Sequence, residues 1–268
     1  MTKTTLIIPD AIRQHLPADA FGTMMQFQGK VFRDVSGRKT LQIKIDGRSY
    51  FIKQHFGVGW SEIFKNLINF KKPILGAMVE VAAIQKMNAI GIPTTPLVAY
   101  GERGLNPAAR ESFVLTEDLG DIISLEDLAS SWQHQSAKMK HALIVAVAEL
   151  ATKLHGAGLC HRDFYLCHIM AKKIDLEQQY VHLYLIDLHR VLHYQASDSV
   201  AIMKDIAGLF FSAQQYAWSD EDLTLFKQHY LPQTAKFWVQ VDLRAQKLRR
   251  KFNSEKFQAR LAADKAKL

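Results

Sequence analysis

The feature that most constrains this chain is the stretch of residues 159–168, Leu-Cys-His-Arg-Asp-Phe-Tyr-Leu-Cys-His. It follows a segment in which apolar residues recur at helical spacing from Met139 to Leu154. An apolar run over residues 181–186 comes later and ends in a second aspartate, Asp187. The sequence therefore predicts a helix, then a loop that carries Asp163, then a strand that delivers Asp187.

This order of elements is the catalytic layout of protein-kinase-like phosphotransferases. In that chemistry one aspartate accepts the proton of the attacking hydroxyl, and a second carboxylate holds Mg²⁺ on the phosphates of ATP. Asp163 fits the first role and Asp187 fits the second. A His-Arg-Asp tripeptide alone is weak evidence, so the remaining parts of such a site have to be found elsewhere in the chain.

The first half of the chain reads as strands, at residues 27–33, 39–45, 48–54, 93–104 and 112–116. Asp46-Gly47 is a hairpin signal because glycine tolerates positive φ. The polar residues 117–121 suit a hinge beside the adenine. We expect an α+β, protein-kinase-like two-lobe fold. Residues 1–118 would form an N-terminal lobe with an antiparallel sheet plus one helix, and residues 119–268 a mainly helical C-terminal lobe.

A lysine and a glutamate complete the pattern. Lys53 lies near the end of the third predicted strand. Residues 76–90 predict a helix that ends at Gly91, and Glu80 falls on its apolar stripe. A carboxylate in such a place needs a cationic partner, and Lys53 is the obvious one. A kinase uses this pair to grip the nucleotide, although a lysine at a strand end can also simply extend to solvent.

Several positions depart from the protein-kinase pattern. After four intervening residues Asp163 is followed by His168, where kinases place a metal-binding asparagine. Histidine can bind a divalent ion through a neutral ring nitrogen, but Mg²⁺ prefers oxygen. The glycine-rich loop is reduced to Gly29, Asp187-Leu188-His189 replaces Asp-Phe-Gly, and no Ala-Pro-Glu follows. This is not a eukaryotic-type protein kinase.

The motifs closely resemble those of the bacterial lipopolysaccharide core heptose(I) kinases. The matching stretches are Gln28-Gly29-Lys30-Val31-Phe32-Arg33, Ser61-Glu62-Ile63 with Lys65-Asn66-Leu67, Pro73-Ile74-Leu75-Gly76-Ala77, residues 161–168, and Ile186-Asp187-Leu188-His189-Arg190. The resemblance implies a kinase-like fold and ATP-dependent phosphorylation of the first heptose of the inner core. It implies Asp163 as catalytic base and Asp187 as metal ligand, and it suggests acyl carrier protein as a partner.

Charge and composition bear on the partners. The net charge is +8, and residues 244–268 hold nine basic and two acidic residues, a balance of +7. Such a segment indicates an anionic partner or a solvated helix face. With the resemblance, we expect inner-core lipopolysaccharide as substrate and peripheral contact with the cytoplasmic face of the inner membrane, rather than nucleic acid. The longest apolar run, residues 142–148, is too short to span a bilayer.

Other interpretations stay open at this level. Cys160, His161, Cys167 and His168 have ligand types that suit zinc, although their spacing does not. A related kinase could act on Kdo, on an aminoglycoside or on a protein hydroxyl, and a catalytically dead scaffold could bind lipopolysaccharide. Asp205 either bonds the backbone of the catalytic loop or is a solvated helix residue.

Overall fold

The computed structural model describes residues 4–35, 37–57, 59–60, 64, 76–193, 199–216 and 218–265. The predicted insertion at residues 56–73 lies mostly outside these ranges. Contacts divide the chain into two compact units. Unit 1 comprises Met1–Lys86, Thr95–Leu119 and Leu188–Arg190, and unit 2 comprises Met87–Thr94, Gly120–Asp187 and Val191–Leu268.

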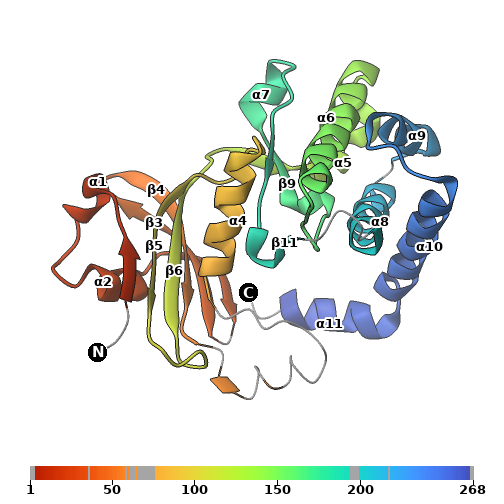
Figure 1. Cartoon of the computed structure of the whole chain (residues 1–268). Helices are drawn as coiled ribbons and strands as arrows, with labels where there is room; N and C mark the ends of the chain where they lie inside the picture. Colours follow the sequence, from red (N-terminus) through yellow and green to blue (C-terminus); the bar gives the residue numbers. More distant parts are fainter. Residues whose placement is uncertain are drawn as a thin grey trace. The chain divides into compact units, whose positions relative to one another are not determined.

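Unit 1 is built on a six-stranded antiparallel sheet (Figure 1). Its strands are β1 (Thr4–Ile7), β2 (Lys30–Val35), β3 (Arg38–Ile45), β4 (Arg48–His55), β5 (Leu97–Arg103) and β6 (Glu111–Glu117), in the order β1-β5-β6-β4-β3-β2. Asp46 and Gly47 join β3 to β4 with φ of 48° and 74°. Positive φ at both positions is typical of a type I′ hairpin turn, so the predicted turn is present.

The first helices cover one face of this sheet. Helices α1 (Asp10–Arg13) and α2 (Ala20–Gln26) place Ile12, Phe21 and Met24 against inward side chains of β3, β4 and β6. The buried Gln54 of β4 donates from Nε2 to the carbonyl of Met24 (2.8 Å). Residues 1–24 carry no sharp sequence pattern, yet they supply three of the twelve buried residues of this core. Burying each large apolar side chain contributes about 1.5–3 kcal/mol.

Helix α4 (Met78–Ala89) lies on the opposite face of the sheet. Side chains alternate along a strand, so Lys53 points away from the face that Ile52 and Gln54 share. That second face is where Glu80 of α4 meets Lys53. Strand alternation thus separates an apolar core on one side from a charged pair on the other.

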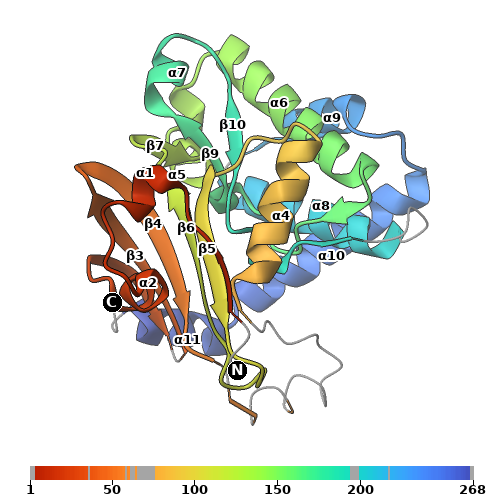
Figure 2. The same ribbon diagram turned by 60° about the vertical axis from the view of Figure 1, so that its left-hand side comes forward.

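Unit 2 is mainly helical. Its helices are α5 (Leu125–Ala129), α6 (Ala137–Gly156), α7 (Lys173–Glu177), α8 (Ser199–Gln215), α9 (Asp220–His229), α10 (Ala235–Phe252) and α11 (Glu255–Lys265). Helix α10 packs along α8, and α9 packs along α6 (Figure 2). Ser124 caps α5 by accepting from the Asp127 amide (2.9 Å). Within the described ranges, no helix has the length and apolar character needed to cross a membrane.

Two small sheets flank the loops of unit 2. Strands β7 (Ile122–Ser124), β9 (Ile169–Lys172) and β10 (Leu183–Leu185) pair in the order β10-β9-β7. Strands β8 (Leu159–Cys160) and β11 (Leu192–His193) form the second sheet. The sequence patterns missed most of these strands because they are only two to four residues long. The loop with Asp163 therefore runs from β8 to β9.

Candidate active site

The lysine and glutamate predicted to pair do so in unit 1. Lys53 Nζ lies 2.5 Å from Glu80 Oε1, and the Glu80 side chain is 5% exposed. A charge this deeply buried is costly unless an opposite charge lies beside it. Glu80 Oε2 has no hydrogen-bond partner among the described residues. The pair therefore holds the lysine ammonium at a fixed place on the face of the sheet.

Gly29 lies directly before β2, close against the backbone of β3. A Cβ at this position would come 2.2 Å from the Gln42 carbonyl oxygen and 3.0 Å from a methyl carbon of Ile43. Any side chain would force the two strands apart. Close strand approach therefore explains the glycine by itself, and nucleotide contact is not needed to account for it.

The predicted hinge is tied to the sheet through a side chain that sequence reasoning did not single out. Asp118 Oδ2 accepts from Gln42 Nε2 (2.6 Å) and from Ser49 Oγ (2.7 Å). Its partners lie 76 and 69 residues away in the chain, so no local pattern indicates the contact. These bonds fix the end of β6 against β3 and β4.

In unit 2, a buried carboxylate holds the loop that carries Asp163. Asp205 of α8 is 2% exposed and accepts from the backbone N–H groups of His161 (2.6 Å) and Arg162 (2.8 Å). Arg162 has a φ of 71°, a left-handed conformation that costs about 1–3 kcal/mol in a non-glycine residue. Of the two sequence interpretations of Asp205, the bond to the loop backbone is the one present.

Asp205 is held in turn by two further buried side chains. A carboxylate can only accept, so His155 Nε2 donates to Asp205 Oδ2 (3.4 Å). In the neutral ring, His155 Nδ1 then accepts from the hydroxyl of Tyr230 (2.7 Å). Burial raises the pKa of Tyr230 well above its usual value, with Cys160 and Asp205 adding to the shift, so the phenol keeps its proton.

Asp187 and His168 converge because of how β9 and β10 pair. The strands are antiparallel with Leu185 opposite Ile169, so the residues after β10 face those before β9. The amide of Ile186 donates to the His168 carbonyl (3.0 Å). His161 Nε2 donates to the Ile186 carbonyl (2.9 Å), which joins the loop to the segment of Asp187 a second time.

The His168 ring lies between the two catalytic candidates. Its Nδ1 is 2.7 Å from the carbonyl oxygen of Asp163, and its Nε2 is 3.7 Å from Asp187 Oδ2. Asp187 has a φ of 60°, a second strained backbone in the same region. Two ligand atoms bonded to the same divalent ion can lie up to about 4.2 Å apart. An ion can therefore touch both donors, and these two residues fit a metal.

The alternative zinc set is not assembled. His161 Nε2 and His168 Nδ1 are each committed to a backbone carbonyl. Burial and the nearby Glu126 raise the pKa of Cys167 to about 12, which disfavours the thiolate that zinc needs. Across the described ranges, the side chains close enough to share an ion are His155, Cys160 and Asp205. In that trio, His155 and Asp205 already hydrogen-bond to each other. His155 also bonds Tyr230, and Asp205 also bonds the loop backbone.

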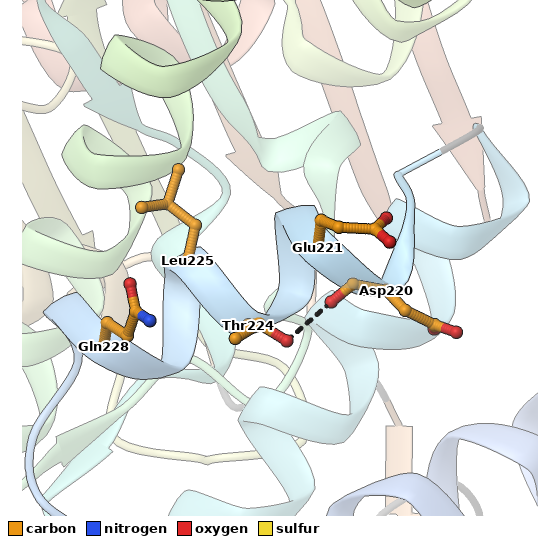
Figure 3. Close-up of a pocket in the computed structure, with 5 residues that line it drawn as sticks. All are labelled: Asp220, Glu221, Thr224, Leu225 and Gln228. Carbon is orange, nitrogen blue, oxygen red and sulfur yellow. Dashed lines mark hydrogen bonds between the residues drawn. The ribbon is translucent and has the colours of Figure 1, made fainter.

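A shallow hollow of about 260 Å³ lies elsewhere on unit 2, along α9 (Figure 3). It is lined by Asp220, Glu221, Thr224, Leu225 and Gln228. The Thr224 hydroxyl donates to the Asp220 carbonyl (2.8 Å). None of the predicted site residues lines this hollow, so it is no part of the candidate active site.

His55 stands two residues beyond Lys53 on the same face of β4 and is 5% exposed. Its pKa is lowered from 6.5 to about 3, chiefly by burial and also by the neighbouring charges of Arg38, Lys53 and His189. The ring is therefore neutral at pH 7. A neutral residue here avoids adding a positive charge beside the lysine.

Fold and site together define a class: an enzyme that transfers phosphoryl groups on a protein-kinase-like α+β framework. The profile of one family in this class, "Lipopolysaccharide kinase (Kdo/WaaP) family", matches residues 23–230. The chain belongs to that family and is a kinase.

Its relatives have specific names. A protein of Pseudomonas aeruginosa, "Lipopolysaccharide core heptose(I) kinase WaaP", is 40% identical over 217 residues, which cover 79% of this chain and 80% of that protein. Its namesake in Escherichia coli K12 is 37% identical over 215 residues, covering 79% and 81%. A solved structure, "WaaP in complex with acyl carrier protein", is similar with a TM-score of 0.74 at 32% identity, covering 91% of this chain and 99% of that one.

The pKa of His55 predicts how stability depends on pH. Protons bind the unfolded histidine below about pH 6.5 but the folded one only near pH 3, so acid favours unfolding across this window. Relative to His55→Gln, the wild type should lose about 2 kcal/mol of unfolding free energy between pH 6.5 and 5. Urea denaturation at pH 7, 6 and 5 measures this. Parallel profiles for the two proteins would contradict the assignment, and the exposed His134→Gln serves as the control.

Proposed function

We propose that this protein transfers the γ-phosphoryl group of ATP to heptose I of the lipopolysaccharide inner core. The name and high coverage of its relatives support the acceptor. The structural observation that carries the proposal is that one short loop bears both Asp163 and His168, with His168 3.7 Å from Asp187. Kinase chemistry needs a proton acceptor and a metal-binding carboxylate in such proximity.

In this proposal Asp163 is the catalytic residue that orients the heptose hydroxyl and takes its proton. The hydroxyl oxygen bonds to the γ-phosphorus as the bond to the bridging oxygen of ADP breaks, and the proton passes to the Asp163 carboxylate. The anchoring of the loop by Asp205 keeps that carboxylate in one position, which suits a reaction driven by positioning.

We assign nucleotide binding to Lys53, with Glu80 holding its ammonium in place. Gly29 would let the backbone approach the phosphates from the start of β2. Asp187 and His168 would hold Mg²⁺, which when bound neutralises charge on the transferring phosphates. We also propose that residues 1–118 act as the nucleotide lobe and residues 119–268 as the lobe for catalysis and the acceptor.

Asp163→Asn tests the reaction and the base together. The amide keeps the shape of the side chain but cannot take the proton, so phosphate transfer from ATP to inner-core lipopolysaccharide lacking heptose phosphate should fall about 10²–10⁴-fold. Nucleotide affinity should stay unchanged. The exposed Glu177→Gln is the matched control.

The position of the new phosphate on the product separates this proposal from its alternatives. Phosphate on heptose I supports the assignment, and phosphate on Kdo would move the acceptor to the neighbouring sugar. Equal transfer by wild type and Asp163→Asn would exclude Asp163 as the base. No transfer by the wild type, with ATP still bound, would favour a binding scaffold.

We further propose that the outer face of α10 docks on an anionic membrane surface. One side of this helix is buried against α8 through Phe237, Val241 and Ala245. The other side exposes Lys236, Val239, Leu243, Lys247 and Arg250. Val239 and Leu243 are 56% and 59% exposed. Two apolar side chains among basic ones suit an interface where each cation near anionic lipid contributes about 1 kcal/mol.

The same basic face suits acyl carrier protein, an acidic partner, because complementary charge steers association. The solved relative bound to acyl carrier protein supports this second partner for the chain. The location that follows from the two proposals is the cytoplasmic face of the inner membrane, with peripheral attachment.

Charge reversal on α10 tests the docking face. Lys247→Glu with Arg250→Glu should remove most co-sedimentation with phosphatidylglycerol vesicles and weaken association with acyl carrier protein, since each change reverses one charge. The control reverses two exposed lysines elsewhere, Lys44→Glu with Lys138→Glu, and so alters net charge equally. Equal losses of binding in the two double variants would mean that net charge alone causes the effect, and would contradict a docking face on α10.

A further inference from the structure

The protonation of His168 follows from its partners. A carbonyl oxygen can only accept a hydrogen bond, so His168 Nδ1, 2.7 Å from the Asp163 carbonyl, carries a proton. In the neutral ring the other nitrogen, Nε2, then presents a lone pair. The backbone of the catalytic loop thereby selects the form of the histidine that can bind a metal.

That lone pair faces an anion. His168 Nε2 lies 3.7 Å from Asp187 Oδ2, and both atoms are acceptors when the ring is neutral. Two acceptors so placed repel unless a proton or a cation lies between them. The side chains of both residues are 22% exposed, so solvent ions can reach the gap. The pair is therefore a ready bidentate site of one nitrogen and one carboxylate oxygen.

The two donor groups are also held in place by other contacts, so the ion has to adapt to these donor types. The His168 backbone carbonyl bonds the Ile186 amide at 3.0 Å, directly beside Asp187. The His168 ring also lies against the ring of His161, with centroids 5.6 Å apart. The donors cannot easily be exchanged for others, so the ion must accept an imidazole nitrogen or leave that position to water.

Divalent ions differ in how well they accept imidazole. Mg²⁺ prefers an octahedral shell of oxygens and gives up water reluctantly. Nitrogen ligands favour the first-row transition ions, with affinity rising from Mn²⁺ towards Cu²⁺. An asparagine at this position, as in protein kinases, offers an oxygen instead.

We propose that His168 is a metal-specificity residue, which makes this site bind Mn²⁺ in preference to Mg²⁺. The inference rests on the proposed function for the location of the metal site. It goes further in assigning selectivity to one nitrogen, positioned by the carbonyl of the catalytic aspartate itself.

The test is direct metal binding to the full-length protein. Mn²⁺ affinity is measured by electron paramagnetic resonance, and Mg²⁺ affinity by competition against Mn²⁺, for wild type, His168→Asn and the exposed control His134→Asn. The ratio of Mn²⁺ to Mg²⁺ affinity should fall by at least about tenfold in His168→Asn and stay constant in the control. Electron spin-echo spectra of bound Mn²⁺ should show a directly bonded ¹⁴N that disappears in His168→Asn.

Two results would overturn the inference: an unchanged affinity ratio in His168→Asn, or wild-type Mn²⁺ spectra without a bonded nitrogen. Neither result concerns the proposed function, which the transfer assay with the heptose acceptor tests separately. A protein that transfers phosphate with Mg²⁺ and binds Mn²⁺ only through oxygen would keep its proposed function and lose this inference. A protein that binds Mn²⁺ through nitrogen but transfers no phosphate would do the reverse.

Discussion

The arrangement of the loop that carries Asp163 depends on the buried carboxylate of Asp205. It accepts two consecutive backbone N–H groups, one of them from Arg162 in a left-handed conformation. An anion in such a place is costly unless its oxygens are satisfied, and here the loop itself and His155 satisfy them. The loop and the carboxylate therefore stabilise each other, and the position of Asp163 follows from both.

The proposed base and the proposed metal site share one framework. His161 bonds the carbonyl of Ile186, while His168 bonds the carbonyl of Asp163. The antiparallel pairing of β9 with β10 brings the chain segments together before any side chain acts. A shift of the loop would move Asp163, His168 and Asp187 together. That coupling suits phosphoryl transfer, which depends on positioning more than on covalent chemistry.

Much of this was predictable from local pattern. Lys53 in a strand and Glu80 on an apolar helix stripe predicted each other because a buried carboxylate needs a cation. The Asp46-Gly47 turn followed from residue type for a similarly local reason. The packing of α1 and α2 on the sheet was not predictable. Phe21 and Met24 are core residues only because they contact β3, β4 and β6, which are distant in the sequence.

The site contacts that the sequence did not predict are also long-range, so no local pattern indicates them. Asp118 meets Gln42 across 76 residues, and Tyr230 meets His155 across 75. Polar residues in such contacts look like ordinary surface residues in the sequence. Asp205 differed, because the sequence offered its bond to the loop backbone as one of two roles, although it left the choice undecided.

The most direct test of the account is the rate of phosphate transfer by Asp205→Asn, measured beside its nucleotide affinity and its thermal unfolding. The amide fills the same space but turns an N–H group towards the loop, where an acceptor is needed. We predict a folded protein that binds ATP as the wild type does and transfers phosphate to the heptose acceptor at least about tenfold more slowly. A folded Asp205→Asn that transfers phosphate at the wild-type rate would contradict the claim that this carboxylate positions the catalytic loop.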